Sequence, residues 1–163
     1  MTSRDTVEPE FNASANQALS EPMPCGIGVG KCPGRILIMD DEEFILDVTG
    51  EVLLELGYEV EVSRDGSEAL KKYEQAMIEG KRFDAVIMDL TIPRGLGGRE
   101  AISLLLEIDP EAKAIISSGH TNDPIITNFL AYGFAGVVPK PYKIKDLSQT
   151  LDNVLRAARL YGT

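Results

Sequence analysis

The chain has 163 residues, of which 44% are hydrophobic and 26% are charged, a composition typical of one folded globular domain. Its 16 Lys and Arg against 26 Asp and Glu give a formal net charge of −10, which argues against a nucleic-acid surface, because phosphate binding needs a basic footprint. No apolar run approaches the roughly 18 residues of a membrane span, and the acidic, polar start of the chain does not resemble a signal peptide. We therefore expect a cytoplasmic protein that does not insert into a membrane.

Residues 1–34 differ in character from the rest of the chain. They contain many Pro, Ser, Asn and Glu residues without apolar periodicity, which predicts a flexible leader or linker. Cys25 and Cys32 lie here, and two thiols cannot build a four-ligand zinc site when the one histidine, His120, is far away in sequence. We expect two reduced thiols. The glycines between them do not form a phosphate-binding loop, which needs Ser or Thr where Cys32 stands and follows a strand rather than preceding one.

From Arg35 onward, short apolar runs alternate with helical patterns. Residues 36–39 are apolar and predict a buried strand. Apolar side chains recur at helical spacing over residues 44–56, and Gly57 ends that helix. Residues 58–63 alternate apolar with polar side chains, which is typical of a half-buried strand.

The same alternation continues through the middle of the chain. Asp65, followed three places later by Glu68, has the pattern of a capping box and predicts the start of a helix. A strand of the fully buried type follows at residues 85–88, and then a loop rich in Pro and Gly. The next helix is closed by the Asp-Pro pair at 109–110, before a strand over residues 112–117.

The last part of the chain continues the alternation of strands and helices. Asp123, followed by a proline at the first helical position, predicts a helix that ends at Gly133. A strand over residues 135–138 and a final helix from Ile144 complete the series. Five strands alternating with five helices predict an α/β domain over residues 35–161, with a doubly wound five-stranded parallel sheet and helices on both faces.

Functional side chains follow the strands of this predicted sheet. In such folds a ligand lies outside the carboxyl ends of the strands, where the strand order reverses. Asp40 and Asp41 follow the first strand, Asp89 the third, Ser118 the fourth and Lys140 the fifth. Taken singly, each has an ordinary structural role as a helix cap, turn residue or surface charge. Together they favour one site, in which either a hard cation such as Mg²⁺ offsets the repulsion between carboxylates or one Asp accepts a phosphoryl group.

The order of these residues resembles that of the receiver domains of two-component response regulators. In that family an acidic pair follows the first strand, the phosphoacceptor Asp ends the third, a hydroxyl residue ends the fourth and Lys-Pro ends the fifth. The matching positions are Asp40-Asp41, Asp89, Ser118-Gly119 and Lys140-Pro141. Residues 88–93, with Gly97-Gly98, further resemble receivers attached to hybrid sensor histidine kinases. The resemblance covers about four-fifths of the chain and implies the flavodoxin-like (βα)5 fold.

The resemblance implies a role for each of these residues. Asp89 would take a phosphoryl group from a phosphohistidine, Lys140 would pair with that group, and Ser118 would turn toward it on activation. The only catalysis would be promotion of the chain's own phosphorylation and dephosphorylation. The ligands implied for Mg²⁺ (or Mn²⁺) are Asp41, Asp89, the backbone carbonyl of Thr91, and Asp40 either directly or through water.

The resemblance also implies partners. The phosphoryl donor would be a sensor histidine kinase or a histidine phosphotransfer domain, and residues 122–160 would offer a face for a homodimer. His120, two places after Ser118, is expected to be an exposed loop residue over the site. The family usually places Tyr or Phe three residues before the lysine, but this position is Val137, so we expect a smaller change of surface on activation.

Two alternative functions are compatible with an acidic site of this kind. A phosphatase of the haloacid-dehalogenase type also uses an Asp nucleophile and Mg²⁺. That family has the motif Asp-x-Asp after its first strand, whereas this chain has Asp40-Asp41-Glu42, in which the second acid comes one place too early. A pseudo-receiver would bind partners without phosphorylation. Such a module normally lacks the acceptor or the lysine, and here both Asp89 and Lys140 are present.

Overall fold

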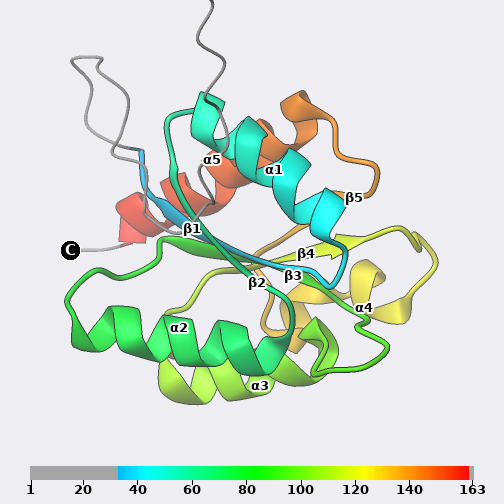
Figure 1. Cartoon of the computed structure of the whole chain (residues 1–163), viewed down its shortest axis with the longest axis horizontal. Helices are drawn as coiled ribbons and strands as arrows, with labels where there is room; N and C mark the ends of the chain where they lie inside the picture. The colour runs from blue at the N-terminus through cyan, green and yellow to red at the C-terminus, as the bar shows by residue number, and fades with distance from the viewer. Residues whose placement is uncertain (1–32, 162–163) are drawn as a thin grey trace, which may run out of the picture.

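Figure 1 shows a computed structural model of the chain, in which residues 33–161 are described. The predictions for the leader, Cys25 and Cys32 fall on residues outside this range, except that Pro33 and Gly34 lead into the first strand. The carbonyl of Gly34 accepts a hydrogen bond from the Glu59 amide at 3.0 Å. Within the described residues, no helix is both long enough and apolar enough to cross a membrane.

The described residues form a parallel sheet with the strand order β2-β1-β3-β4-β5 (Figure 1). The strands are β1 (Arg35–Met39), β2 (Glu59–Ser63), β3 (Ala85–Asp89), β4 (Ala114–Ser118) and β5 (Gly136–Pro139). Strand β1 pairs with β2 on one side and with β3 on the other, so the strand order reverses between β1 and β3. The sequence located each of these strands to within two residues at either end.

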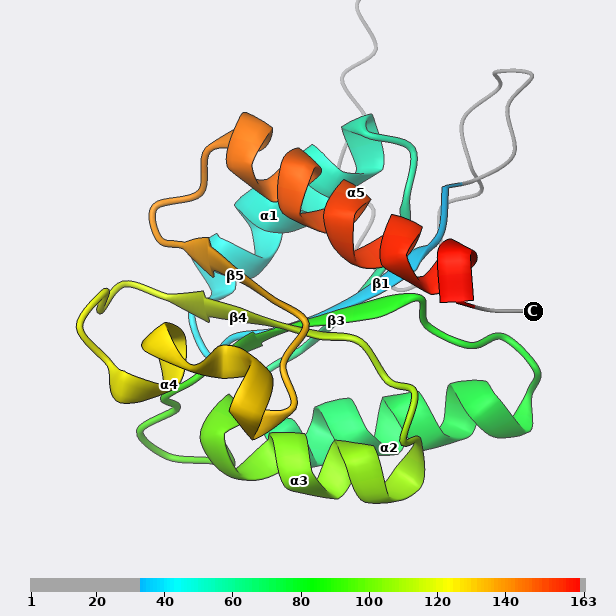
Figure 2. The same ribbon diagram turned by 180° about the vertical axis from the view of Figure 1, so that it is seen from behind.

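Helices cover both faces of the sheet, which confirms the doubly wound α/β fold. They are α1 (Glu43–Glu55), α2 (Gly66–Ile78), α3 (Gly98–Ile108), α4 (Pro124–Thr127), the 3₁₀ helix η1 (Phe129–Tyr132) and α5 (Ile144–Tyr161). Figures 1 and 2 show α1 and α5 on one face and α2, α3 and α4 on the other. Each face therefore has its own apolar layer.

The side chains of each central strand alternate between these two layers. Ile36 and Ile38 of β1 pack in the layer under α1 and α5, whereas Leu37 and Met39 pack in the layer under α2 and α3. Strands buried on both faces need apolar residues at every position, which is why they appear in the sequence as continuous apolar runs.

The buried face of α1 differs from the one that the apolar spacing predicted. Leu46, Thr49, Gly50 and Leu53 are buried, while Phe44 is 73% exposed. Successive helical residues are about 100° apart, so Phe44 lies about 200° around the helix from Leu46 and cannot share its face. The apolar pattern over residues 44–56 therefore predicted the helix correctly, but Phe44, the first residue of that pattern, does not lie on the buried face.

The predicted helix between residues 123 and 133 is broken in the structure. Its start is confirmed, because Asp123 Oδ1 accepts a hydrogen bond from the Ile125 amide at 2.9 Å. However, α4 ends at Thr127, and Asn128 has φ −129° and ψ 42° before η1 begins. Isoleucine, threonine and asparagine are all poorer helix formers than Ala or Leu, so this segment has little intrinsic reason to stay helical. Gly133 ends η1 with φ +93°, as its predicted role as a helix stop requires.

Candidate functional site

Two aspartates lie side by side where the strand order reverses. Met39 of β1 is in register with Met88 of β3, so the next residues, Asp40 and Asp89, are neighbours at the carboxyl edge of the sheet. The Asp40 side chain is 1% exposed and that of Asp89 is 13% exposed. The predicted convergence of these two residues is confirmed.

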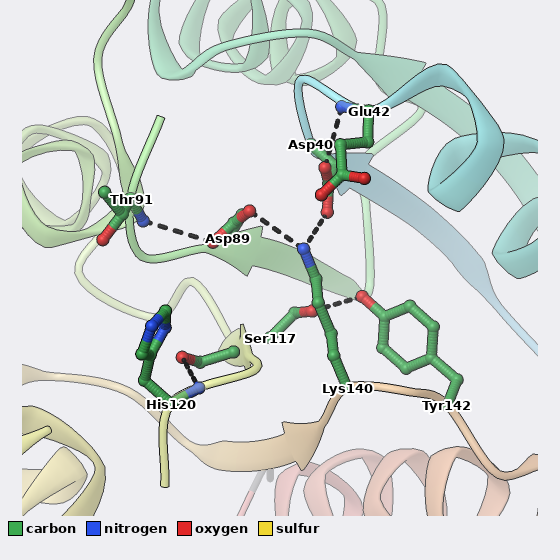
Figure 3. Close-up of polar contacts among 9 residues, drawn as sticks. Asp40, Glu42, Asp89, Thr91, Ser117, His120, Lys140 and Tyr142 are labelled. Atoms are coloured by element: carbon green, nitrogen blue, oxygen red, sulfur yellow. Dashed lines mark hydrogen bonds and ion pairs between the residues drawn. The ribbon is translucent and has the colours of Figure 1, made fainter. Parts of the chain in front are cut away.

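Lys140 places its ammonium group between these carboxylates (Figure 3). Its Nζ lies 2.5 Å from Asp40 Oδ2 and 2.9 Å from Asp89 Oδ2. The backbone holds the residue in place, because the Lys140 amide donates to the Ser118 carbonyl at 2.9 Å and so continues the pairing of β5 with β4. The peptide bond from Lys140 to Pro141 is cis.

The electrostatics of the ion pairs keep Lys140 charged. Burial alone would lower the pKa of its ammonium group, but the hydrogen bonds to Asp40 and Asp89 outweigh burial and raise that pKa well above its usual value. Lys140 is therefore protonated throughout the neutral range. Its contact with the buried Asp40 is a feature that sequence reasoning did not foresee, because the resemblance paired Lys140 only with the phosphoryl group.

Asp41 adds a third carboxylate to the cluster. Ligand oxygens of Asp40, Asp41 and Asp89 all lie within 4.8 Å of one another, with Asp40 buried and Asp41 exposed. Three formal negative charges against the one positive charge of Lys140 leave a formal charge of −2 (−3 + 1). Carboxylate oxygens in this number and spacing suit a hard divalent cation. The residues present therefore fit the metal ion that the resemblance implied.

The two central aspartates also have local structural roles. Asp40 Oδ1 accepts a hydrogen bond from the Glu42 amide at 2.9 Å, just before α1 begins. Asp89 Oδ1 accepts one from the Thr91 amide at 3.2 Å. Thr91 thus lies next to Asp89, and the expected role of its carbonyl as a metal ligand stays a prediction. The turn and site roles of these carboxylates are compatible, because each aspartate uses its other oxygen for Lys140.

Ser118 lies near the site but is bonded within its own loop. Its side chain is buried, and its Oγ accepts a hydrogen bond from the His120 amide at 3.1 Å. His120 is exposed, as expected for a loop residue over the site. The structure therefore holds Ser118 in an arrangement from which it would have to turn to reach a group on Asp89.

Two glycines bring the loop after β3 close to the start of α3. A Cβ atom at Gly97 would lie 2.5 Å from the Leu90 carbonyl oxygen, and one at Gly98 would lie 2.8 Å from that of Asp89. No larger residue fits at either position without moving backbone. The Gly-Gly pair therefore allows the start of α3 to pack directly against the backbone of Asp89 and Leu90.

Sequence reasoning missed a pair of hydroxyl residues beside the site. The Tyr142 hydroxyl is hydrogen-bonded to Ser117 Oγ (Figure 3). Burial raises the pKa of Tyr142, and the nearby charges of Asp40 and Asp89 add to that effect, although Ser117 and Lys140 oppose it. Their positions in the sequence could have indicated that both residues lie near the site, because Tyr142 follows Lys140 by two residues and Ser117 directly precedes Ser118.

The sheet order and the acidic edge together define a flavodoxin-like α/β domain with a carboxylate cluster at its switch point. Residues 36–152 match the family model described as the response regulator receiver domain. The chain is 31% identical over 139 residues to the chemotaxis protein CheY of Treponema pallidum, which covers 85% of this chain and 94% of that protein. The chain therefore belongs to the response regulator receiver domain family, and the haloacid-dehalogenase alternative is set aside.

Relatives include receivers that are parts of sensor kinases. The chain is 39% identical over 89 residues to the CAI-1 autoinducer sensor kinase/phosphatase CqsS of Vibrio cholerae, a match that covers 55% of this chain and 12% of that kinase. Among solved structures, it is similar to the receiver domain of sensor histidine kinase PA1611 from Pseudomonas aeruginosa, with a TM-score of 0.66 and 25% identity over 76% of this chain and 98% of that one. The latter structure has a magnesium ion coordinated in its active-site cleft.

Proposed function

We propose that Asp89 is the phosphoacceptor of this receiver domain and that Lys140 and Ser118 assist the transfer. Accepting a phosphoryl group in two-component systems is the general function of the family. The observation that carries the assignment is the Lys140 ammonium lying between Asp89 and the buried Asp40, with Asp41 completing the cluster.

The proposed transfer is a displacement at phosphorus. An oxygen of the Asp89 carboxylate attacks the phosphorus of a phosphohistidine, and a new O–P bond forms. The P–N bond breaks, and its electron pair stays on the imidazole nitrogen of the donor. The Lys140 ammonium, already 2.9 Å from Asp89 Oδ2, stabilises the negative charge of the phosphoryl oxygens. Ser118 turns from the His120 amide to donate its hydroxyl to the same oxygens. Hydrolysis later returns Asp89 to its free carboxylate.

The carboxylate cluster is the proposed magnesium site. Asp40, Asp41 and Asp89 would hold Mg²⁺ or Mn²⁺ together with the carbonyl of Thr91, and the ion would neutralise charge on the transferring group. Three carboxylates within 4.8 Å of one another support this proposal. The magnesium ion in the similar PA1611 receiver supports it further.

The proposed donor is a sensor histidine kinase or a histidine phosphotransfer domain. Sensor kinases among the relatives support this partner class. Phosphohistidine is made from ATP, so a cytoplasmic location belongs to the same proposal. Residues 122–160, which include the exposed apolar side chains of Leu130, Tyr132 and Ile144, form the proposed homodimer face. Sedimentation equilibrium with and without a phosphoryl mimic tests that face, and a monomer in both states would rule it out.

Incubation with acetyl phosphate tests the proposed function. With Mg²⁺, intact-mass spectrometry should show one added phosphoryl group on the parent chain and none on Asp89→Asn. The matched control is Asp152→Asn, which makes the same change at an exposed position of α5 and should be labelled like the parent. An unlabelled parent chain would favour the pseudo-receiver alternative, and a labelled Asp89→Asn variant would move the acceptor elsewhere.

A further inference from the structure

A partly buried hydrogen bond between two hydroxyl groups lies beside the site and has no part in the transfer described above. Tyr142 packs against the apolar layer under α1 and α5, and Ser117 is 1% exposed. Their side-chain oxygens are hydrogen-bonded to each other (Figure 3). A buried hydroxyl without a partner is costly, so each of these groups depends on the other.

Ser117 lies in register between the two strands that carry the reacting groups. On one side it is paired with Asp89 of β3, and on the other with Val138 of β5. Strand alternation directs Ile115 into the layer under α1 and α5, and Ser117, two residues on, faces the same way. The Ser117 hydroxyl is thus on the side of the sheet where Tyr142 packs.

The segment that carries Lys140 is fastened to the end of β4 at two points. Before the cis bond, the Lys140 amide donates to the Ser118 carbonyl at 2.9 Å. After it, the Tyr142 hydroxyl is bonded to Ser117. Lys140 lies between these two hydrogen bonds along the chain, and its Nζ lies 2.5 Å from Asp40 Oδ2 and 2.9 Å from Asp89 Oδ2. Loss of the hydrogen bond between Tyr142 and Ser117 would allow the backbone of Lys140 to shift relative to Asp89.

We propose that Tyr142 is a positioning residue, which through its hydrogen bond to Ser117 holds the Lys140 ammonium between Asp40 and Asp89. This inference rests on the proposed function, because its consequence is a faster phosphorylation of Asp89. Groups held in the productive geometry react faster than groups that must find it, and small displacements of a catalytic group are costly. Tyr142 itself touches no reacting atom.

The test compares phosphorylation rates of the full chain at saturating Mg²⁺ and a fixed concentration of acetyl phosphate. The variants are Tyr142→Phe, Ser117→Ala and the double variant. The matched control is Tyr73→Phe, which also removes a buried tyrosine hydroxyl. Tyr73 donates to Asp109 Oδ2 at 2.7 Å, and Asp109 precedes β4, at the opposite edge of the sheet from the site.

We expect Tyr142→Phe to slow phosphorylation about 5-fold, which corresponds to one hydrogen bond of about 1 kcal/mol. Ser117→Ala should slow it by a similar factor. The double variant should be no slower than the slower single variant, because both changes remove the same bond. Tyr73→Phe should lower the melting temperature but keep the parental rate.

Three results would overturn the inference while leaving the proposed function intact. The first is a Tyr142→Phe variant that is phosphorylated at the parental rate. The second is a double variant whose rate falls by the product of the two single-variant factors. The third is a Tyr73→Phe variant that is slowed as much as Tyr142→Phe, which would trace the effect to general destabilisation. A parent chain that accepts no phosphoryl group would instead overturn the proposed function, and the inference with it.

Discussion

Replacing Lys140 by methionine tests how much the ammonium group contributes to the fold. Lys140→Met keeps a long unbranched side chain but removes the positive charge between Asp40 and Asp89. The Asp40 side chain is 1% exposed, so its carboxylate would remain buried next to a second carboxylate without a counter-charge. We therefore expect a large loss of stability in the absence of a divalent cation.

The size of that loss follows from the burial of the three groups. Removing one partner of a buried ion pair typically costs about 3–5 kcal/mol. Lys140 and Asp89 keep 14% and 13% of their side-chain surface exposed, so water screens part of the interaction and favours the lower end of that range. A loss of about 3 kcal/mol would lower the melting temperature of a domain of this size by about 10 °C.

Urea unfolding with EDTA or with Mg²⁺ measures the effect. At the proposed site, Mg²⁺ would bind the native state and offset the carboxylate repulsion, so it should stabilise Lys140→Met more than it stabilises the parent. The control Lys145→Met removes an exposed lysine from the start of α5 and should change stability by less than about 0.5 kcal/mol.

The pH dependence of the stability difference between the parent and Lys140→Met provides a second check. Folding raises the pKa of Lys140, so its contribution is fully present below the pKa of an unfolded lysine, about 10.4, and is lost as pH rises through the higher folded value. The difference between parent and variant should thus be constant from about pH 7 to 9 and shrink only above about 10.5. A variant as stable as the parent in EDTA would refute this reasoning.

The remaining predictions concern stability and the response to phosphorylation. Gly50→Ala should stabilise the fold by about 1 kcal/mol in thermal unfolding, because a Cβ atom at this mid-helix position meets nothing within 4 Å. Gly66→Ala should destabilise the fold, because its Cβ atom would lie 2.8 Å from a carbonyl oxygen. A Gly50→Ala variant less stable than Gly66→Ala would contradict both predictions. Asp65→Ala should cost about 1 kcal/mol by removing the helix cap to the Glu68 amide, and an unchanged melting temperature would show that the cap is dispensable. Beryllofluoride should change hydrogen exchange over residues 122–160 modestly in the parent and more in Val137→Tyr; large, equal changes in both would show that position 137 does not limit the response.

The fold and the position of the site were predictable because both depend on patterns that are local in sequence. Buried parallel strands produced continuous apolar runs, and their carboxyl ends necessarily meet at one edge of the sheet. Asp40, Asp89 and Lys140 could therefore be brought together before any coordinates were known. Asp123 and Asp65 were likewise identifiable as caps from residue type and spacing alone.

Features that depend on tertiary packing could not be predicted in this way. The exposure of Phe44 depends on which side of α1 meets the sheet, and the break at Asn128 depends on how the segment closes onto β5. The contact of Lys140 with Asp40 and the bond between Tyr142 and Ser117 join residues far apart in sequence, with separations of 100 and 25 residues. The pattern of strands brings such residues to one edge of the sheet, but it does not determine which of their side-chain atoms form bonds.

Chemical mapping of the phosphorylated residue tests the central claim most directly. Borohydride reduces an aspartyl phosphate to homoserine with loss of phosphate, so tandem mass spectrometry of the phosphorylated and reduced chain identifies the acceptor. Three carboxylates lie within 4.8 Å of one another, and the measurement distinguishes among them. The account predicts homoserine at position 89 and unmodified Asp40 and Asp41. Homoserine at position 40 or 41, or none at all in the presence of acetyl phosphate and Mg²⁺, would contradict it.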